Sequence, residues 1–415
     1  MKKIFLFVFA ASLFSASVAQ KDVKVVPDSK PVDAKPMNGN LPSSFDVNRK
    51  TLISNPAIEK FTPLSGFTVE RNNEATPVKN QAMTGTCWCF SSTSLLESQC
   101  LKKGIGEFDL SEMFTVRNIY LEKARNYVLR QGHAQFGEGG LGHDLIRAVA
   151  NYGAVPESEY NGLMPGQQMH NHVKLSGALK NYLDSILKIM PLPSEWFKGY
   201  QHIVDSALGL PPADFQYGNK RYTPKSFAAE VLKFSADDYV NITSFTHHPY
   251  YEPYIIEVPD NFSNGSYYNL PLNEMIQVTK DAIRNGYTVL WDADVSNNGF
   301  MQQRAIALQY DTSVKIKTKQ ELLSGNLVEP KWDAGIRQKL YENLTTQDDH
   351  LMHITGIETS STGKTFFIVK NSWGDMGPNH GYINVSETYF AINTISLVIP
   401  KAALNRSLLE KLKIK

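Results

Sequence analysis

A cysteine in the first turn of a helix is the feature that most constrains what this chain can be. Residues 87–103 contain no proline, repeat apolar side chains at helical spacing and run into Gly104, so they are predicted to form a helix. Thr86 is the expected N-cap, which places Cys87 in the first turn. Unpaired N–H groups and the positive end of the helix dipole lie there and favour a thiolate over a thiol. The stretch therefore predicts a nucleophilic cysteine, with an ordinary buried cysteine as the alternative.

A side chain just before this helix is suited to assist such a nucleophile. A thiolate that attacks an amide needs hydrogen-bond donors for the oxyanion that develops. Gln81 lies on the loop that leads into the helix, six residues before Cys87. Its side-chain amide is expected to supply one of these donors.

These residues resemble the Gln-x-x-x-Gly-x-Cys-Trp-x-Phe signature of the papain superfamily of cysteine peptidases. The matching positions are Gln81, Gly85, Cys87, Trp88 and Phe90. Thr84 stands where the common form of the motif has a second cysteine. The resemblance implies an α+β fold, with a helical half that carries the cysteine, an antiparallel β-barrel half and a cleft between them. It also implies peptide or protein substrates and a reaction that needs neither a metal nor an organic cofactor.

A papain-like thiolate needs an imidazole and a third group that orients the ring. Residues 348–357 have the form of the histidine strand of this superfamily, and residues 371–374 are its Asn-Ser-Trp-Gly signature. The spacing to the glycine near the end of the strand selects His350 over His353, which is left as a packing or surface residue. Asn371 is then expected to hold the ring of His350, with Trp373 shielding their hydrogen bond from water.

A pair of glycines marks the expected substrate-binding edge. Adjacent glycines let another backbone come close, and Gly139 and Gly140 stand where papain-like enzymes pair with an extended substrate. The resemblance therefore implies substrate contacts by this pair and by Trp88 and Trp373. A turn that needs positive φ is the alternative explanation of the glycines.

The chain is longer between its cysteine and histidine than the superfamily requires. Cys87 and His350 are 263 residues apart (350 − 87), against about 130–150 in ordinary papain-like peptidases. A mostly helical and loop insertion is predicted at 161–270, between a helical subdomain at 76–160 and a barrel subdomain with a C-terminal helix at 271–415.

The insertion and Thr84 together resemble the bleomycin hydrolase and bacterial aminopeptidase C branch. In that branch the chain continues as an arm into the cleft, restricts the enzyme to aminopeptidase action and accompanies a hexameric ring. Here 44 residues (415 − 371) follow Asn371, so the arm is expected to be missing. Aminopeptidase or endopeptidase action and the oligomeric state therefore stay open.

Composition limits the other partners of the chain. A net charge of +1 over 415 residues provides no field that would attract nucleic acid or an anionic membrane, so neither is an expected partner. The three cysteines, Cys87, Cys89 and Cys100, are expected to be free thiols, because on one helix they cannot reach one another.

Five histidines fall in the predicted insertion and are best explained as surface residues, with metal binding as the alternative. They are His170, His172, His202, His247 and His248.

The first residues have the form of an export signal. Residues 1–19 join two lysines, an apolar run and Ser-Val-Ala, as in a secretory signal peptide cleaved after Ala19. The mature protein is therefore expected to be secreted or periplasmic and free of the membrane. Residues 20–75 are predicted to be a lead segment and N-terminal strap, with a removable propeptide as the alternative.

The sequence as a whole predicts an exported papain-like cysteine peptidase. Cys87 attacks the peptide carbonyl, Gln81 and the Cys87 N–H stabilise the oxyanion, and His350 protonates the leaving amine before water releases the acyl group. Two alternatives remain: a papain-shaped peptide-binding protein without turnover, and an amide hydrolase or acyltransferase that acts on a non-peptide substrate.

Overall fold

The computed structural model describes residues 66–309 and 327–414, all of them within one compact unit. The predicted signal peptide and most of the lead segment lie outside these residues. The helices are α1 (Cys87–Lys102), α2 (Glu112–Leu129), α3 (Gly142–Tyr152), α4 (Val173–Ile186), α5 (Trp196–Leu208), α6 (Pro224–Ser226), α7 (Leu272–Arg284), α9 (Ala334–Glu342), α10 (Glu387–Asn393) and α11 (Arg406–Lys411). Short 3-10 or π-helical turns cover Phe227–Val231, Ala236–Asp238, Gln302–Arg304 and Lys401–Ala403.

The strands range from two to eleven residues. They are β1 (Phe67–Asn72), β2 (Phe215–Tyr217), β3 (Lys220–Tyr222), β4 (Tyr239–Thr243), β5 (Pro253–Ile255), β6 (Ser266–Asn269), β7 (Val289–Ala293), β8 (Phe300–Met301), β9 (Ile306–Ala307), β10 (His350–Ser360), β11 (Thr365–Lys370), β12 (Tyr382–Ser386) and β13 (Thr394–Pro400).

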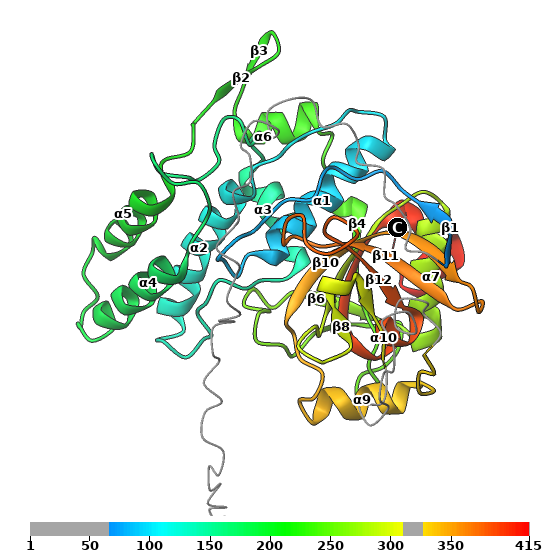
Figure 1. Ribbon diagram of the computed structural model, residues 1–415. Helices are drawn as coiled ribbons and strands as arrows, with labels where there is room; N and C mark the ends of the chain where they lie inside the picture. Colours follow the sequence, from blue (N-terminus) through cyan, green and yellow to red (C-terminus); the bar gives the residue numbers. More distant parts are fainter. Residues whose placement is uncertain (1–65, 310–326, 415) are drawn as a thin grey trace, which may run out of the picture. The chain divides into compact units, whose positions relative to one another are not determined.

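Helix α1 lies at the centre of the fold, between α2 and α3 on one side and the sheet on the other (Figure 1). Every residue from Cys87 to Cys100 is buried, and the helix contacts α2, α3 and β10. A helix buried on all sides needs small or apolar side chains around its whole circumference, and α1 combines Trp88, Leu95 and Leu96 with serines. The start of α1 is therefore held by packing from both halves of the molecule.

Most of the strands form one mixed sheet with the order β5-β6-β4-β13-β7-β10-β11-β12-β9-β8, and β1 pairs with the far end of β10, whereas β2 and β3 form a separate hairpin. Most ladders are antiparallel, and β12/β9 and β4/β6 are parallel. The predicted α+β class is confirmed. Within the described ranges the sheet runs as an open path, and its two end strands, β5 and β8, have three and two residues.

The segment predicted as an insertion, 161–270, contributes to both halves. Helices α4 and α5 pack beside α2, away from the sheet, whereas β4 and β6 extend the sheet next to β13 (Figure 1). The loop between β5 and β6, residues 256–265, then returns to the helical half. There Ser263 donates a hydrogen bond to Asp144, at 2.7 Å. This loop reaches the start of α3, close to the predicted substrate edge.

The N-cap residues of α1 and α2 differ in their side-chain hydrogen bonds. Ser111 caps α2, since its hydroxyl accepts a hydrogen bond from the Phe114 N–H. Thr86 is the N-cap residue of α1, but its side chain makes no capping bond, because its hydroxyl is paired with that of Thr84 at 2.6 Å. Within 66–309 and 327–414, each helix is too short or too polar to cross a bilayer.

Candidate active site

Cys87 begins α1 and is 8% exposed. The backbone N–H of Leu351, the residue after His350 in β10, donates a hydrogen bond to its sulfur. In the described part of the chain, the Cys87 backbone N–H has no hydrogen-bond acceptor of its own. The sulfur is thus fixed beside the predicted histidine strand, and the N–H is free to bind an oxyanion.

The state of the thiol differs from the expectation. Burial raises the pKa of the Cys87 thiol to about 12, and the charges of Asp260, Asp292 and Asp348 act in the same direction. The prediction that the helix terminus would favour a thiolate is wrong for the free protein, because desolvation outweighs the dipole and the Leu351 hydrogen bond. Attack by this sulfur therefore requires a neighbouring base that takes up the proton.

His350 has the orientation that such a base needs. Its Nε2 lies 2.7 Å from Oδ1 of Asn371, and the same oxygen accepts a hydrogen bond from the Ser372 N–H. The Asn371 amide donates to Oε1 of Gln302 at 3.0 Å. Because these bonds fix which end of the Asn371 amide is the acceptor, Nε2 of His350 carries the proton and Nδ1 keeps a free lone pair.

Burial also keeps this ring neutral. It lowers the pKa of His350 to about 4, against the opposing effects of the Asn371 hydrogen bond and the Asp349 charge. The indole of Trp373 covers the ring, with centroids 4.6 Å apart and planes inclined by 31°. A neutral imidazole in a single tautomer is the form that accepts a proton from a thiol.

Gln81 is held by the Asn-Ser-Trp-Gly motif. Its Oε1 accepts a hydrogen bond from the Ser372 hydroxyl at 2.6 Å, and its Nε2 donates to the Thr84 carbonyl at 2.7 Å. An amide nitrogen carries two hydrogens, so one remains for a further acceptor. The role of Thr84 is thus visible: its backbone orients Gln81.

His353 lies elsewhere. It is fully buried beneath α1, where its Nδ1 is 2.9 Å from the Ser94 hydroxyl. Its Nε2 has no hydrogen-bond partner in the described ranges, and burial lowers the pKa of the ring well below its usual value. The structure brings His350, and not His353, to Asn371.

The two glycines of the predicted substrate edge lie next to the start of α1. The preceding residue, Glu138, accepts hydrogen bonds from the Gly85 N–H and the Trp88 indole N–H. A Cβ on Gly140 would lie 3.1 Å from the Trp88 ring, and a Cβ on Gly139 would overlap the carboxylate of Asp260. Neither glycine has a positive φ, so close approach, and not turn geometry, explains them.

Three carboxyl groups near the sulfur were missed from the sequence: Asp260, Asp292 and Asp348. Two of them could have been found in the sequence. Asp292 is a charged residue inside the apolar strand β7, and Asp348 lies two residues before His350. Asp260 lies on the β5–β6 loop, and no motif marks it. All three cysteines are free thiols and buried.

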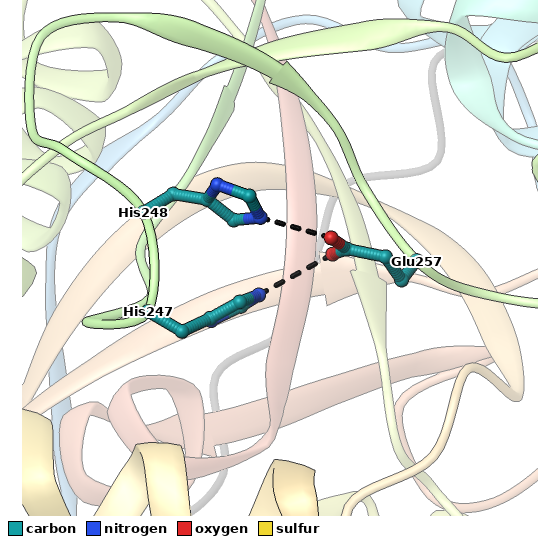
Figure 2. A group of neighbouring side chains, drawn as sticks. All are labelled: His247, His248 and Glu257. Carbon is teal, nitrogen blue, oxygen red and sulfur yellow. Dashed lines mark hydrogen bonds and ion pairs between the residues drawn. The ribbon is translucent and has the colours of Figure 1, made fainter. Parts of the chain in front are cut away.

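A second polar cluster anchors the base of the β5–β6 loop (Figure 2). His247 and His248 turn their Nε2 atoms toward Glu257, at 3.3 and 2.9 Å. These three residues could hold a metal ion by position alone. However, Gln338 accepts from the Thr246 N–H, so its amide nitrogen faces Nδ1 of His247 at 2.9 Å.

That contact decides the chemistry of the cluster. With a donor at Nδ1, the proton of His247 lies on Nε2 and points at Glu257, where a metal would need a lone pair. The cluster is better explained as a hydrogen-bonded anchor of the loop. His170 and His172 lie near the start of the predicted insertion, where their backbones pair with Met83 in the loop before Cys87. The prediction of a surface residue is wrong for His172, which is 2% exposed because its ring packs on Tyr120.

Comparisons with known proteins agree with this fold. The model of the "Peptidase C1-like family" matches residues 137–415, and that of the "Papain family cysteine protease" matches residues 67–168. Aminopeptidase C of Listeria innocua is 24% identical over 406 residues, which cover 87% of this chain and 88% of the relative.

A yeast protein and a solved bacterial structure are also similar to this chain. Mitochondrial cysteine proteinase 1 of Saccharomyces cerevisiae is 23% identical, with 83% of this chain and 79% of the relative covered. The crystal structure of PepW from Lactobacillus rhamnosis superposes with a TM-score of 0.65 at 21% identity, and covers 83% of this chain and 84% of that one. The latter shows the same fold.

Proposed function

Since this chain belongs to the peptidase C1-like family and is a papain-family cysteine peptidase, we propose that its reaction runs through Cys87, His350, Asn371 and Gln81. The observation that best supports this proposal is the fixed tautomer of His350. Oδ1 of Asn371 accepts a hydrogen bond from the Nε2–H of His350, so Nδ1 is the only ring atom that can accept another proton.

The first half of the reaction forms a thioester. The Cys87 thiol passes its proton to Nδ1 of His350 while the sulfur bonds to the substrate carbonyl carbon, and the carbonyl oxygen becomes an oxyanion. The Cys87 N–H and the second N–H of the Gln81 amide donate hydrogen bonds to that oxyanion. When the C–N bond breaks, the leaving amine takes the proton from Nδ1.

The second half returns the enzyme to its starting state. Nδ1 of His350 removes a proton from water, whose oxygen attacks the thioester carbon. The C–S bond breaks, the sulfur regains the proton, and the new carboxyl group leaves. Trp373 lies over the imidazole throughout and keeps the His350–Asn371 hydrogen bond away from solvent.

The relatives named aminopeptidase C support action at free amino termini, and residues 1–19 support export to the periplasm or the medium. Cell fractionation and N-terminal sequencing of the mature protein test export. Retention of residues 1–19 on a cytoplasmic protein would contradict it.

The assignment of the nucleophile is tested by Cys87→Ala. We expect a loss of at least about 10⁴-fold in kcat/KM on fluorogenic aminoacyl and peptidyl amides. The control is Cys100→Ser, which changes another buried thiol of the same helix and should keep activity within about tenfold. Full activity of Cys87→Ala would refute the proposed mechanism.

A further inference from the structure

The loop from Gln81 to Cys87 carries the two expected oxyanion donors, one at each end. Residues 82–86 between them are irregular. Ala82 has a φ of 53°, in the left-handed region that residues with a Cβ rarely adopt. Such a loop keeps one conformation only where its surroundings hold it. The relative position of the two donors therefore depends on the contacts of residues 82–86.

One peptide group in this loop is hydrogen-bonded at both ends. Its carbonyl, that of Thr84, accepts a hydrogen bond from Nε2 of Gln81 at 2.7 Å. Its N–H, that of Gly85, donates to the carboxylate of Glu138 at 2.7 Å. Because a peptide group is planar, rotation of this plane would disturb both bonds. Glu138 therefore fixes the peptide group that orients the Gln81 amide.

Glu138 is also bonded to the other end of the loop. Its backbone carbonyl accepts a hydrogen bond from the Trp88 indole N–H at 3.0 Å, and Trp88 directly follows Cys87. A Cβ on Gly85 would lie 3.0 Å from the Cβ of Glu138, so a glycine is needed for this close approach. Only the contact with Gly85 depends on the Glu138 side chain, which makes it accessible to substitution.

The charge of Glu138 is not the property that this contact needs. A negative charge near a developing oxyanion opposes the reaction, whereas a hydrogen-bond acceptor for Gly85 does not. Burial raises the pKa of the Glu138 carboxyl, against the effects of the Gly85 N–H and the Lys123 charge. Nδ1 of His172 lies 3.8 Å from the carboxylate, but burial lowers the pKa of that ring to about 4 and keeps it neutral.

The middle of the loop has a second anchor in the predicted insertion. The Met83 N–H donates to the His170 carbonyl at 3.1 Å, and the Met83 carbonyl accepts from the His172 N–H at 3.0 Å. Nδ1 of His172 in turn lies 2.9 Å from the hydroxyl of Tyr120 in α2. Loss of the Glu138 carboxylate should thus leave the loop in place and release only the peptide group between Thr84 and Gly85.

We propose that Glu138 is a positioning residue for the oxyanion. Its carboxylate holds the peptide group between Thr84 and Gly85, and through that group it keeps the Gln81 amide directed at the oxyanion. The proposal rests on the proposed function, because the orientation of Gln81 matters only if attack by Cys87 forms an oxyanion. It deepens that function by adding a residue that acts through Gln81 without touching the reacting atoms.

The test compares two substitutions of Glu138 on one fluorogenic peptide amide. Glu138→Ala should lower kcat about 30-fold and change KM less than about threefold, because the oxyanion exists only after attack. Glu138→Gln keeps a side-chain oxygen for the Gly85 N–H and should retain at least about a third of the wild-type kcat. The control is Glu252→Ala, at an exposed ion pair with Lys413, which should keep the wild-type kcat.

A second measurement separates the oxyanion from the nucleophile. Alkylation by iodoacetamide takes place at a saturated carbon and forms no oxyanion, so Cys87 in Glu138→Ala should react within about threefold of the wild-type rate. A fall in alkylation as large as the fall in kcat would overturn the proposal, because the variant would then disturb Cys87 itself. An unchanged kcat in Glu138→Ala, or an equal loss in Glu138→Gln, would overturn it as well.

A double-mutant cycle with Gln81→Ala tests the route of the effect. If Glu138 acts through Gln81, the double variant should have the kcat of Gln81→Ala within about threefold. Losses that multiply would refute this route while leaving the peptidase mechanism intact. Full activity of Gln81→Ala, or no cleavage of any peptide amide by the wild type, would instead contradict the proposed function on which the role of Glu138 rests.

Discussion

Cys87 lies between two groups of buried polar side chains that differ in one respect. On the side that we call the orienting side, each polar group meets a partner. Its members are His350, Asn371, Gln302, Ser372 and Gln81. On the acidic side, carboxyl groups lie close to one another, and the side chains of Asp292 and Asp348 share a hydrogen bond. Its members are Asp260, Asp292 and Asp348.

The difference separates two tasks. A fully satisfied network holds one geometry and one tautomer, which is what a general base requires. Buried carboxyl groups that lie close together raise one another's pKa values, so they keep protons that an ordinary surface acid would release. On this reasoning the orienting side serves the chemistry of each turnover, and the acidic side raises the pKa of the Cys87 thiol.

The largest expected effect contrasts the two histidines of β10. His350→Ala removes the base and should lower kcat/KM by at least about 10⁴-fold. His353→Gln, the matched control in the same strand, changes a ring that contacts Ser94 and should cost less than about tenfold. Steady-state kinetics on one fluorogenic substrate measures both. If His353→Gln were the more damaging change, the assignment of the base would be wrong.

The next effect tests the orienting side alone. Asn371→Ala removes the acceptor of the His350 Nε2 proton and frees the other tautomer, so kcat should fall by about 100-fold with little change in KM. Gln302→Ala, which removes only the contact that steadies Asn371, should cost about tenfold or less. Equal losses in both variants would mean that the ring is oriented by something else.

These assignments show what the sequence could reveal. The residues of the orienting side that lie in short motifs, His350 and Asn371, were predictable because adjacent strands bring them together. The protonation state of Cys87 was not, because its burial depends on packing by both halves. Asp260 was not predictable either, since it is placed by a loop whose contacts are far away in the chain.

The insertion shows the same limit at the level of the fold. Helices were expected within 161–270, and α4 and α5 lie there. Strands β4, β5 and β6, within 239–269, are too short to signal that they join the sheet. Short strands depend on neighbours for their pairing, and neighbours are not visible in one segment of sequence.

A third prediction concerns stability on the acidic side. Burial and then the charge of Asp260 raise the pKa of Asp348 from 3.8 to about 7. The folded protein therefore holds this proton up to about pH 7, while the unfolded chain releases it near 3.8, so the wild type loses stability as the pH rises between these values.

The matched variant Asp348→Asn has no such proton. Its free energy of unfolding relative to the wild type should therefore increase by about 3.5 kcal/mol between pH 4 and pH 7.5. Urea unfolding of both proteins at the two pH values measures this difference. A constant difference would show that the Asp348 carboxyl is solvated like an ordinary surface acid.

The smallest effect links the two sides. The charge of Asp260 raises the pKa of the Cys87 thiol, so its removal in Asp260→Asn should increase the thiolate fraction and speed iodoacetamide alkylation about threefold at pH 8. Peptide mapping confines the measurement to Cys87. A slower reaction in the variant would contradict the electrostatic connection between the loop and the sulfur.

The most direct test of the account asks whether His350 activates Cys87 for attack on a peptide. Intact-mass spectrometry after treatment with a peptidyl vinyl sulfone bearing a free amino terminus counts the thiols that react, and peptide mapping locates them. We predict one equivalent on Cys87 in the wild type, none on Cys89 or Cys100, and at least about a 100-fold slower reaction in His350→Ala. Labelling of another cysteine, or equal rates in the two proteins, would contradict the mechanism.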